Sequence, residues 1–502
     1  MTNNTRRGLW IAAIIGVVVI VTCLCVAVLG LGGLAFIGLR RGSAGESATA
    51  QVVQPPQQEA SQPFATLEPP ARPSTAAPEF PTTALGPGAQ ETLSTLQSVQ
   101  IPYADLRAQA MEFLGLSDIP ETVAFPSEFD AGDANTFWVL NSDTNRYRQV
   151  DTQLAFESPH VYFWVEKGLT YDESALRRLG DEFENKIYPT NREFFVSEWS
   201  PGVDGDPHLY IIYASDMGDN LAGMFSSADS VNPLAYRYSN GHETFFLNAD
   251  NISLDEDFTY GVLAHEFQHM IHWYRDRNEE TWMSEGFSEL AAYLNGYDVG
   301  GFDYAFLMEP STQLDTWPND SGSNAANYGG AFLFLNYFLE RFGEGATKEL
   351  VGNSLNGLES IDQVLESLDA TYPDGSTPYR ADDLFADWTV ANVVNDPSIA
   401  DGRFGYTDYQ MPFEITPTAS LADCLGGWQT GSVNQYGTDY IELACSGQRT
   451  LQFEGASEVD LLPEDAHSGD YAFWSNQGDE SRMALWHSFD LSHAQGTVRM
   501  SY

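Results

Sequence analysis

Basic side chains are scarce in this sequence. The chain of 502 residues has 23 Lys and Arg against 71 Asp and Glu, which gives a net charge of −48. A nucleic-acid-binding surface needs clustered Lys and Arg to neutralise phosphates, and an acidic chain is also repelled by anionic lipid. The composition therefore predicts no nucleic-acid partner and favours solubility through net charge over an acidic surface that binds a partner.

Two kinds of catalytic motif are missing as well. No Gly-rich phosphate loop occurs, and no Ser or Cys stands in a recognisable nucleophile setting. Hydrolysis by a serine or cysteine nucleophile and phosphate-loop chemistry therefore have no support in the sequence.

Cysteine is nearly as rare, with four residues in the chain. Cys23 and Cys25 lie in an apolar segment near the N-terminus, whereas Cys424 and Cys445 stand about twenty residues apart in a strand-like region. A single remaining pair is what one disulfide requires, and disulfides persist outside the cytosol. We predict a Cys424–Cys445 bridge, with two buried free thiols as the alternative.

The N-terminal part lacks acidic residues and carries a long apolar run. Residues 8–39 contain no charge and are flanked by Arg6-Arg7 and Arg40-Arg41. A bilayer span needs ~20 apolar residues, whereas a cleavable signal peptide has an apolar region of ~7–15 residues. Residues 1–41 are therefore predicted to be a retained membrane anchor rather than a cleaved signal.

The segment that follows the anchor is rich in Pro, Ala, Ser, Thr and Gln. Residues 42–100 cannot bury enough apolar surface to fold, so we predict a disordered stalk. Together with the predicted disulfide, this organisation indicates a single-pass protein of the cell membrane whose folded part lies outside the cell.

Residues 101–412 predict an α+β domain. Strand-like runs at 160–166, 208–214 and 243–250 alternate with helical spacing over 173–195. Further helical segments follow from residue 257 to about 394. After residue 412 the pattern changes to short strands and Gly-rich turns, which predicts a separate β-sandwich domain over 413–502.

The sequence LAHEFQHMIHW, residues 263–273, contains a His-Glu-x-x-His motif. A capping-box pattern from Ser253 to Glu256 predicts the start of its helix. Residues four apart lie on one helix face, so His265 and His269 can present two imidazoles to one tetrahedral Zn²⁺. Zinc lowers the pKa of a bound water from about 15.7 to about 7, and Glu266 can take the proton. His272 lies one step off this face and is predicted to have a surface or packing role.

A catalytic zinc site needs one more protein ligand. Glu285 and Glu289 stand four apart in TWMSEGFSELAAYL, on a helix expected from Trp282 to Leu294, so both can face the metal. One of them would ligate zinc while the other orients a histidine. The spacing alone leaves open which does which, and a solvated acidic face is the simpler alternative. Apolar neighbours argue against that alternative, because unpaired buried carboxylates are costly.

These residues resemble a known family. The motif HEFQH followed by WMSEGFSEL is similar to the corresponding motifs of the gluzincin zinc metallopeptidases. The stretch HEFQHM is nearly identical to the sequence at this position in the hyicolysin-like group. Ser284 stands where Asn is common, and the gap between the two motifs is shorter than in thermolysin-like enzymes. The resemblance implies His265, His269 and Glu285 as ligands of one zinc, Glu266 as general base, and Glu289 as the carboxylate behind a ligand.

Two further segments extend the resemblance. NYGGAFLFLNYFLERFG, on a helix expected from about Ala325 to Phe342, is similar to the M1 peptidase segment whose tyrosine steadies the tetrahedral intermediate. This implies that role for Tyr328, with a core aromatic as the alternative. LAGMFSSAD, residues 221–229, stands where the family has an edge strand that binds an extended peptide. It lacks the glutamate with which M1 aminopeptidases hold the substrate amine, so an endopeptidase is favoured.

The C-terminal sequence from residue 469 resembles β-sandwich modules of secreted proteases such as immune inhibitor A. A calcium site is a weaker hypothesis, based on PGVDGDPH at residues 201–208, which is not a full calcium loop. The sequence thus predicts a membrane-anchored zinc endopeptidase that acts on proteins or peptides. The alternatives are an aminopeptidase and a non-catalytic surface binding protein on a degenerate protease scaffold.

Overall fold

The structure is a computed structural model, and all the residues it describes fall in the compact unit Ala50–Tyr502. The predicted anchor at residues 8–39, most of the predicted stalk and Cys424 lie outside the described residues, so the anchor, the stalk and the disulfide stay predictions. No helix within the described ranges combines the length and the apolar character needed to cross a membrane. The described residues are 94–95, 99, 102–124, 128–298, 300–318, 324–422, 428–447, 451–456, 478–485 and 488–499.

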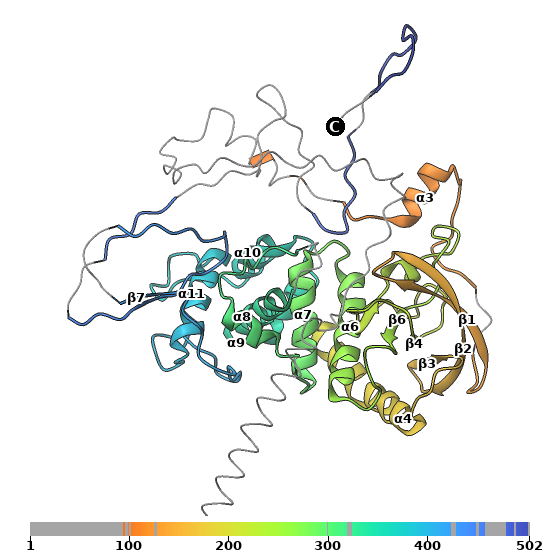
Figure 1. Ribbon diagram of the computed structural model, residues 1–502, viewed down its shortest axis with the longest axis horizontal. Helices are drawn as coiled ribbons and strands as arrows, with labels where there is room; N and C mark the ends of the chain where they lie inside the picture. Colours follow the sequence, from red (N-terminus) through yellow and green to blue (C-terminus); the bar gives the residue numbers. More distant parts are fainter. Residues whose placement is uncertain are drawn as a thin grey trace, which may run out of the picture. The chain divides into compact units, whose positions relative to one another are not determined.

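A mixed six-stranded sheet forms one half of the folded region (Figure 1). Its strand order is β1-β2-β3-β4-β6-β5, with parallel pairing of β3 with β4 and of β4 with β6, and antiparallel pairing elsewhere. The three strand-like runs expected from the sequence are β3, β4 and β6, so these predictions are confirmed. The strands are β1 (Ala134–Asn141), β2 (Arg146–Glu157), β3 (Val161–Glu166), β4 (Leu209–Ala214), β5 (Gly223–Phe225) and β6 (Thr244–Asn248).

The central strands are apolar throughout because both faces of the sheet are covered. Every residue of β4 is buried, as is typical of parallel strands with layers on both sides. Trp164 and Ile212 belong to a core cluster on one face. On the opposite face Phe245 packs against Phe183, with ring centroids 5.8 Å apart, and Phe183 belongs to the helical segment that links β3 to β4. The sheet is thereby held against the helices that carry the site.

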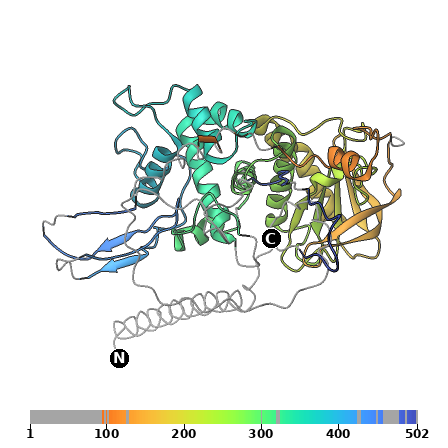
Figure 2. The same ribbon diagram turned by 90° about the horizontal axis from the view of Figure 1, so that it is seen from above.

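The later helices, from α6 to α11, form the other half, and α6 connects it with the sheet. Helix α6 packs against β5 and α5 on one side and against α7 on the other, and α7 in turn packs against α9 (Figure 1). Figure 2 shows the same arrangement from above, with the strands and the later helices on opposite sides of α6 and α7. The helical elements are α3 (Leu106–Leu114), α4 (Glu173–Glu182), the π-helical turn η1 (Phe183–Ile187), α5 (Tyr188–Phe195), the 3-10 turn η2 (Ser227–Ser230), α6 (Asp257–Arg275), α7 (Thr281–Leu294), α8 (Phe302–Met308), α9 (Ala325–Val351), α10 (Gly357–Ser367) and α11 (Ala381–Val394).

The start of α6 differs from the prediction. The helix begins at Asp257 with Glu256 as its N-cap, and no side chain caps it, so the predicted capping box from Ser253 to Glu256 is wrong. The carbonyl of Ser253 instead accepts hydrogen bonds from the amide of Glu256 at 3.2 Å and from Oγ1 of Thr259 at 2.6 Å. Residues 253–256 therefore close a turn before the helix, and Leu254 within that turn is buried.

The ends of α7 and α9 follow the sequence more closely. Helix α7 ends at Asn295-Gly296 as predicted, and Gly296 has the left-handed φ of 76° that glycine tolerates. Gly343, the expected stop of the third helix, has a non-helical φ of 82°. It kinks α9, and a further helical stretch continues to Val351, so this glycine breaks the helix without ending the element.

The region after residue 412 shows little regular structure in its described parts. It contains the short parallel pair β7 (Ala419–Leu421) and β8 (Ile441–Leu443). The α+β class is confirmed for the sheet and helices. The β-sandwich and the predicted domain limits stay predictions.

Candidate metal centre

Three side chains from α6 and α7 converge on one point. Nε2 of His265 and Nε2 of His269 lie 3.0 Å apart, and Oε2 of Glu285 lies 3.2 Å from the first and 3.3 Å from the second. Tetrahedral zinc with bonds of about 2.0–2.1 Å separates its ligand atoms by about 3.3 Å, so these donors fit the ion. Within the described ranges, no other group of three His, Cys, Asp or Glu side chains comes close enough to hold a metal.

The other ring nitrogens of both histidines have partners that orient the imidazoles. Nδ1 of His265 lies 3.1 Å from Oε1 of Glu289, and Nδ1 of His269 lies 3.1 Å from Oγ of Ser284. Each ring therefore turns its Nε2 toward the shared point, as metal-ligating histidines do. The geometry places Glu285 among the candidate ligands and Glu289 behind His265, the arrangement that the resemblance implies. Ser284 was missed, although its place one residue before Glu285 was a usable signal.

Burial and mutual charge set the protonation of this cluster. Burial lowers the pKa of His265, but hydrogen bonds to Glu285 and Glu289 outweigh it and raise the pKa to about 10. Burial raises the pKa of Glu285, yet the neighbouring His269 and His265 bring it below its ordinary value. The carboxylate of Glu285 is therefore ionised, which is the form that binds a cation.

Glu266 lies on α6 beside the first candidate ligand and points toward the edge strand. It is fully buried, and its carboxyl group contacts the backbone N–H of Phe225 in β5. Burial raises its pKa to about 8, although the charge of His265 opposes the shift. A Cβ atom on Gly223 of β5 would come within 3.2 Å of its Oε1. Glu266 therefore faces β5 at close range, and burial favours its protonated form in the zinc-free chain.

Strand β5 is the outermost strand of the sheet, as predicted for residues 221–229. It pairs with β6 on one side and is the last strand in the sheet order. A Cβ on Gly223 would also meet Cγ1 of Val262 at 2.7 Å, so the strand passes directly over α6 because glycine stands there. The edge strand and the candidate metal centre are thus neighbours.

Tyr328 lies in the first turn of α9 and is buried next to the cluster. Its ring stacks on Phe302 with centroids 4.8 Å apart, meets the edge of Trp317 at 4.8 Å, and lies 6.2 Å from the ring of His265. Burial raises its pKa well above the ordinary value, and the charge of Glu285 and a hydrogen bond to it add to the shift. The phenol therefore keeps its proton and can donate it in a hydrogen bond. Phe302 and Trp317 were missed because they are distant in sequence.

The remaining site hypotheses have different outcomes. His272 is buried with its ring against that of Phe287 at 5.4 Å, and burial lowers its pKa to about 3, so it is a neutral packing residue as predicted. The structure does not support calcium at residues 201–208. Asp204 is paired with His242 at 2.5 Å, and Asp206 is paired with His208.

The sheet with its edge strand, the paired helices and the centre of two histidines and one glutamate form the arrangement that the resemblance to the His-Glu-x-x-His metallopeptidases implies. No protein-family model matches the chain. The neutral metalloprotease ShpI of Staphylococcus hyicus is similar to it, with 23% identity over 257 residues that cover 46% of this chain and 58% of that protein. The chain therefore spans less than two thirds of this relative's length. The similarity confirms the predicted resemblance to the metallopeptidases.

Solved structures give weaker likenesses. An M1 zinc metallopeptidase from Deinococcus radiodurans has 14% identity and a TM-score of 0.27, over 56% of this chain and 54% of that chain. A variant of that enzyme bound to a Tyr-Ser-Ala substrate gives a TM-score of 0.29 at 14% identity, with the same coverage. The resemblance of the C-terminal residues to the immune inhibitor A module stays a prediction.

Proposed function

We propose that the chain is a zinc-dependent endopeptidase that holds one zinc ion per chain through His265, His269 and Glu285. The observation that supports this most is the near-equilateral triangle of Nε2, Nε2 and Oε2 atoms, with sides of 3.0, 3.2 and 3.3 Å. A degenerate scaffold used only for binding has no need of such a complete donor set, nor of a buried glutamate beside it.

Zinc in this position would supply Lewis-acid chemistry, because it polarises a carbonyl oxygen and acidifies water. Glu266 is the general base that takes a proton from the attacking water, since its buried carboxyl group follows His265 on α6 and faces β5, where the peptide would bind. Tyr328 donates a hydrogen bond to the oxygen that gains negative charge as the peptide carbon becomes tetrahedral. A preorganised donor of this kind contributes ~3 kcal/mol to transition-state stabilisation.

The substrate is an extended peptide that adds to the free edge of β5. Backbone groups of Gly223–Phe225 would pair with it by β-augmentation and bring a peptide bond beside Glu266. The strand has no acidic side chain that could hold a free amino terminus. An internal bond is therefore the favoured target, which distinguishes an endopeptidase from an aminopeptidase.

We also propose that residues 8–39 anchor the chain in the cell membrane with the peptidase outside the cell. This rests on the uncharged apolar run, the stalk composition and the lone Cys424–Cys445 pair in the sequence. Labelling of thiols on intact cells, with and without reductant, tests it. Two free thiols, together with a stalk that added protease cannot reach, would place the catalytic region in the cytosol and refute the proposal.

Metal analysis of the purified full-length chain, combined with digestion of casein, tests the catalytic proposal. We expect one zinc per chain, loss of peptidase activity on chelation, and recovery on return of zinc. A folded chain that contains no zinc and takes up none on titration would refute it.

Two matched peptides separate the two kinds of peptidase. One has a free amino terminus and the other carries an N-acetyl group on the same sequence. An endopeptidase cleaves both at the same internal bond, whereas an aminopeptidase releases the first residue of the free peptide alone. Zinc binding without cleavage of either peptide or of casein would favour the binding-protein alternative.

A further inference from the structure

A short segment near the C-terminus, residues 478–485, packs against the N-terminal edge of the folded region. The amide of Ala104 donates to the carbonyl of Glu480 at 2.6 Å, and the amide of Arg482 donates to the carbonyl of Pro102 at 2.9 Å. These bonds flank a bridge between Tyr103 and Ser481, so the two segments form a minimal antiparallel pair.

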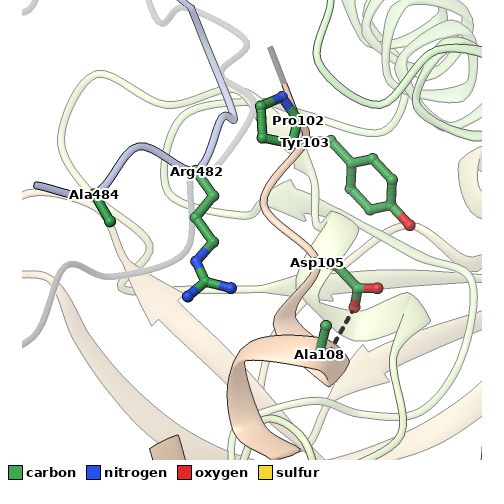
Figure 3. A pocket seen from close by; sticks show the side chains of 6 residues that line it. All are labelled: Pro102, Tyr103, Asp105, Ala108, Arg482 and Ala484. Carbon is green, nitrogen blue, oxygen red and sulfur yellow. Dashed lines mark hydrogen bonds between the residues drawn. The ribbon is translucent and has the colours of Figure 1, made fainter. Parts of the chain in front are cut away.

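Side chains reinforce the pair on the α3 side. Arg482 reaches from the C-terminal segment toward α3 (Figure 3). Its guanidinium lies 2.5 Å from Oε2 of Glu112 and over the ring of Phe113. A pocket of about 440 Å³ lies in the seam between the two segments. It is lined by Pro102, Tyr103, Asp105, Ala108, Arg482 and Ala484.

The same C-terminal segment also contacts α7, the helix that carries Glu285. Oδ2 of Asp479 accepts hydrogen bonds from the amide of Thr281 at 2.8 Å and from its Oγ1 at 2.7 Å. Thr281 is the first residue of α7, whose own N-cap residue, Glu280, makes no side-chain capping bond. The first turn of α7 contains no acidic residue. Asp479 therefore supplies, from about 200 residues away, the anionic acceptor that a helix N-terminus needs.

This cap sits one helical turn from the candidate metal centre. Thr281 and Glu285 are four residues apart and so lie on the same face of α7. Ser284, whose Oγ is 3.1 Å from Nδ1 of His269, immediately precedes Glu285. Fraying of the first turn would therefore move both a candidate ligand and the partner that orients a second one.

We propose that Asp479 is a positioning residue for the zinc site, which makes the C-terminal segment 478–485 a working part of the peptidase instead of an appended module. The inference rests on the proposed function. It assigns to Asp479 no contact with metal or substrate, since it acts through α7.

The test compares four full-length variants by zinc affinity in competition with a chelator. Amide hydrogen exchange of Met283–Glu285 in the zinc-free protein is the second measurement. Asp479→Ala removes the cap, Asp479→Asn keeps an acceptor oxygen, and Thr281→Val removes one donor. Asp490→Ala is the matched control, because Asp490 lies in the same C-terminal region and accepts a bond only from nearby Ser492 among the described residues, at 2.9 Å.

We expect Asp479→Ala to weaken zinc binding about fivefold, the equilibrium effect of losing a typical N-cap, and to speed exchange in the first turn of α7. Asp479→Asn should remain within about twofold of the wild type, because asparagine also caps well. Thr281→Val should fall between the two, and Asp490→Ala should match the wild type.

The inference is overturned if Asp479→Ala has the same zinc affinity and the same amide exchange rates as the control Asp490→Ala. It is also overturned by a loss of global stability with unchanged zinc affinity, which would make the contact merely structural. If Asp479→Ala fails to fold, wild-type affinity and exchange in Thr281→Val overturn it instead. A wild-type chain that binds no zinc is a different outcome, because it refutes the proposed function itself.

Discussion

Glu266 and Glu285 are both buried glutamates of one cluster, yet their surroundings give them opposite protonation. Two histidine nitrogens within 3.3 Å keep Glu285 ionised. Burial outweighs the charge of His265 and the backbone hydrogen bond from Phe225 at Glu266, and raises its pKa to about 8. In the zinc-free chain an ionised carboxylate and a protonated carboxyl group thus stand side by side, which makes their roles separable by substitution.

Glu266→Gln should retain zinc and lose peptidase activity by several orders of magnitude. Glutamine fills the same buried space but cannot accept the proton from water. Zinc content and kcat/KM on casein peptides are the measurements, with the wild type as reference. A variant that cleaves at the wild-type rate would show that another group is the base.

Glu285→Ala and Glu289→Ala should differ in their effect on the metal. Loss of Glu285 removes one of three donor atoms, so we expect a protein that no longer retains zinc through purification. Loss of Glu289 removes only the partner of Nδ1 of His265, which should weaken zinc binding ~10–100-fold. Chelator competition measures both, and an exchange of the two results would reverse the assignment of ligand and supporting carboxylate.

At the scale of elements, close approach of helices decides where Tyr328 lies. A Cβ atom on Gly329 would come within 1.9 Å of the carbonyl oxygen of Phe302, so α9 touches the start of α8 through the missing side chain. A Cβ on Gly286 of α7 would meet Ala331 of α9 at 2.9 Å. Glycines thus bring α7, α8 and α9 close enough for Tyr328 to reach the cluster.

Gly329→Ala should destabilise the fold by ~1–3 kcal/mol, because the added methyl group forces α8 and α9 apart. It should also lower kcat, since the phenol of Tyr328 moves with the helix. The matched control is Gly345→Ala in the same helix, where an added Cβ meets nothing within 4 Å and stability should rise slightly. Urea unfolding of both variants checks this, and equal midpoints would contradict the packing argument.

At the scale of the whole molecule, an acidic chain buries carboxyl groups that resist ionisation. Asp229 lies in η2 between β5 and β6 and accepts a hydrogen bond from the amide of Asn240 at 2.6 Å. Burial raises its pKa to about 7. The folded chain therefore binds a proton at Asp229 that the unfolded chain has already released.

Stability should fall as pH rises from about 4 to about 7 because of this group. The folded state binds more protons than the unfolded state in that window, so the free energy of unfolding decreases with pH until Asp229 ionises in both states. Asp229→Asn keeps an acceptor but cannot titrate, so the wild type should lose more stability than this variant between pH 5 and pH 8. Urea unfolding in the presence of chelator measures the difference. Parallel curves for the two proteins would refute it.

The sequence by itself determined those features of this protein that depend on residues close together in the chain. A spacing of four on one helix brings His265 and His269 to the same face, and apolar runs predict β3, β4 and β6, because both depend on near neighbours in the chain. Tertiary structure decided the rest. Spacing alone did not distinguish Glu285 from Glu289 as the zinc ligand. The packing of α6 on α7 places Glu285 beside the Nε2 atoms of both histidines and Glu289 at Nδ1 of His265. The cap of α7 by Asp479 has the same origin, since a hydrogen bond between residues about 200 apart depends on where the folded chain brings them and leaves no periodic trace in the sequence.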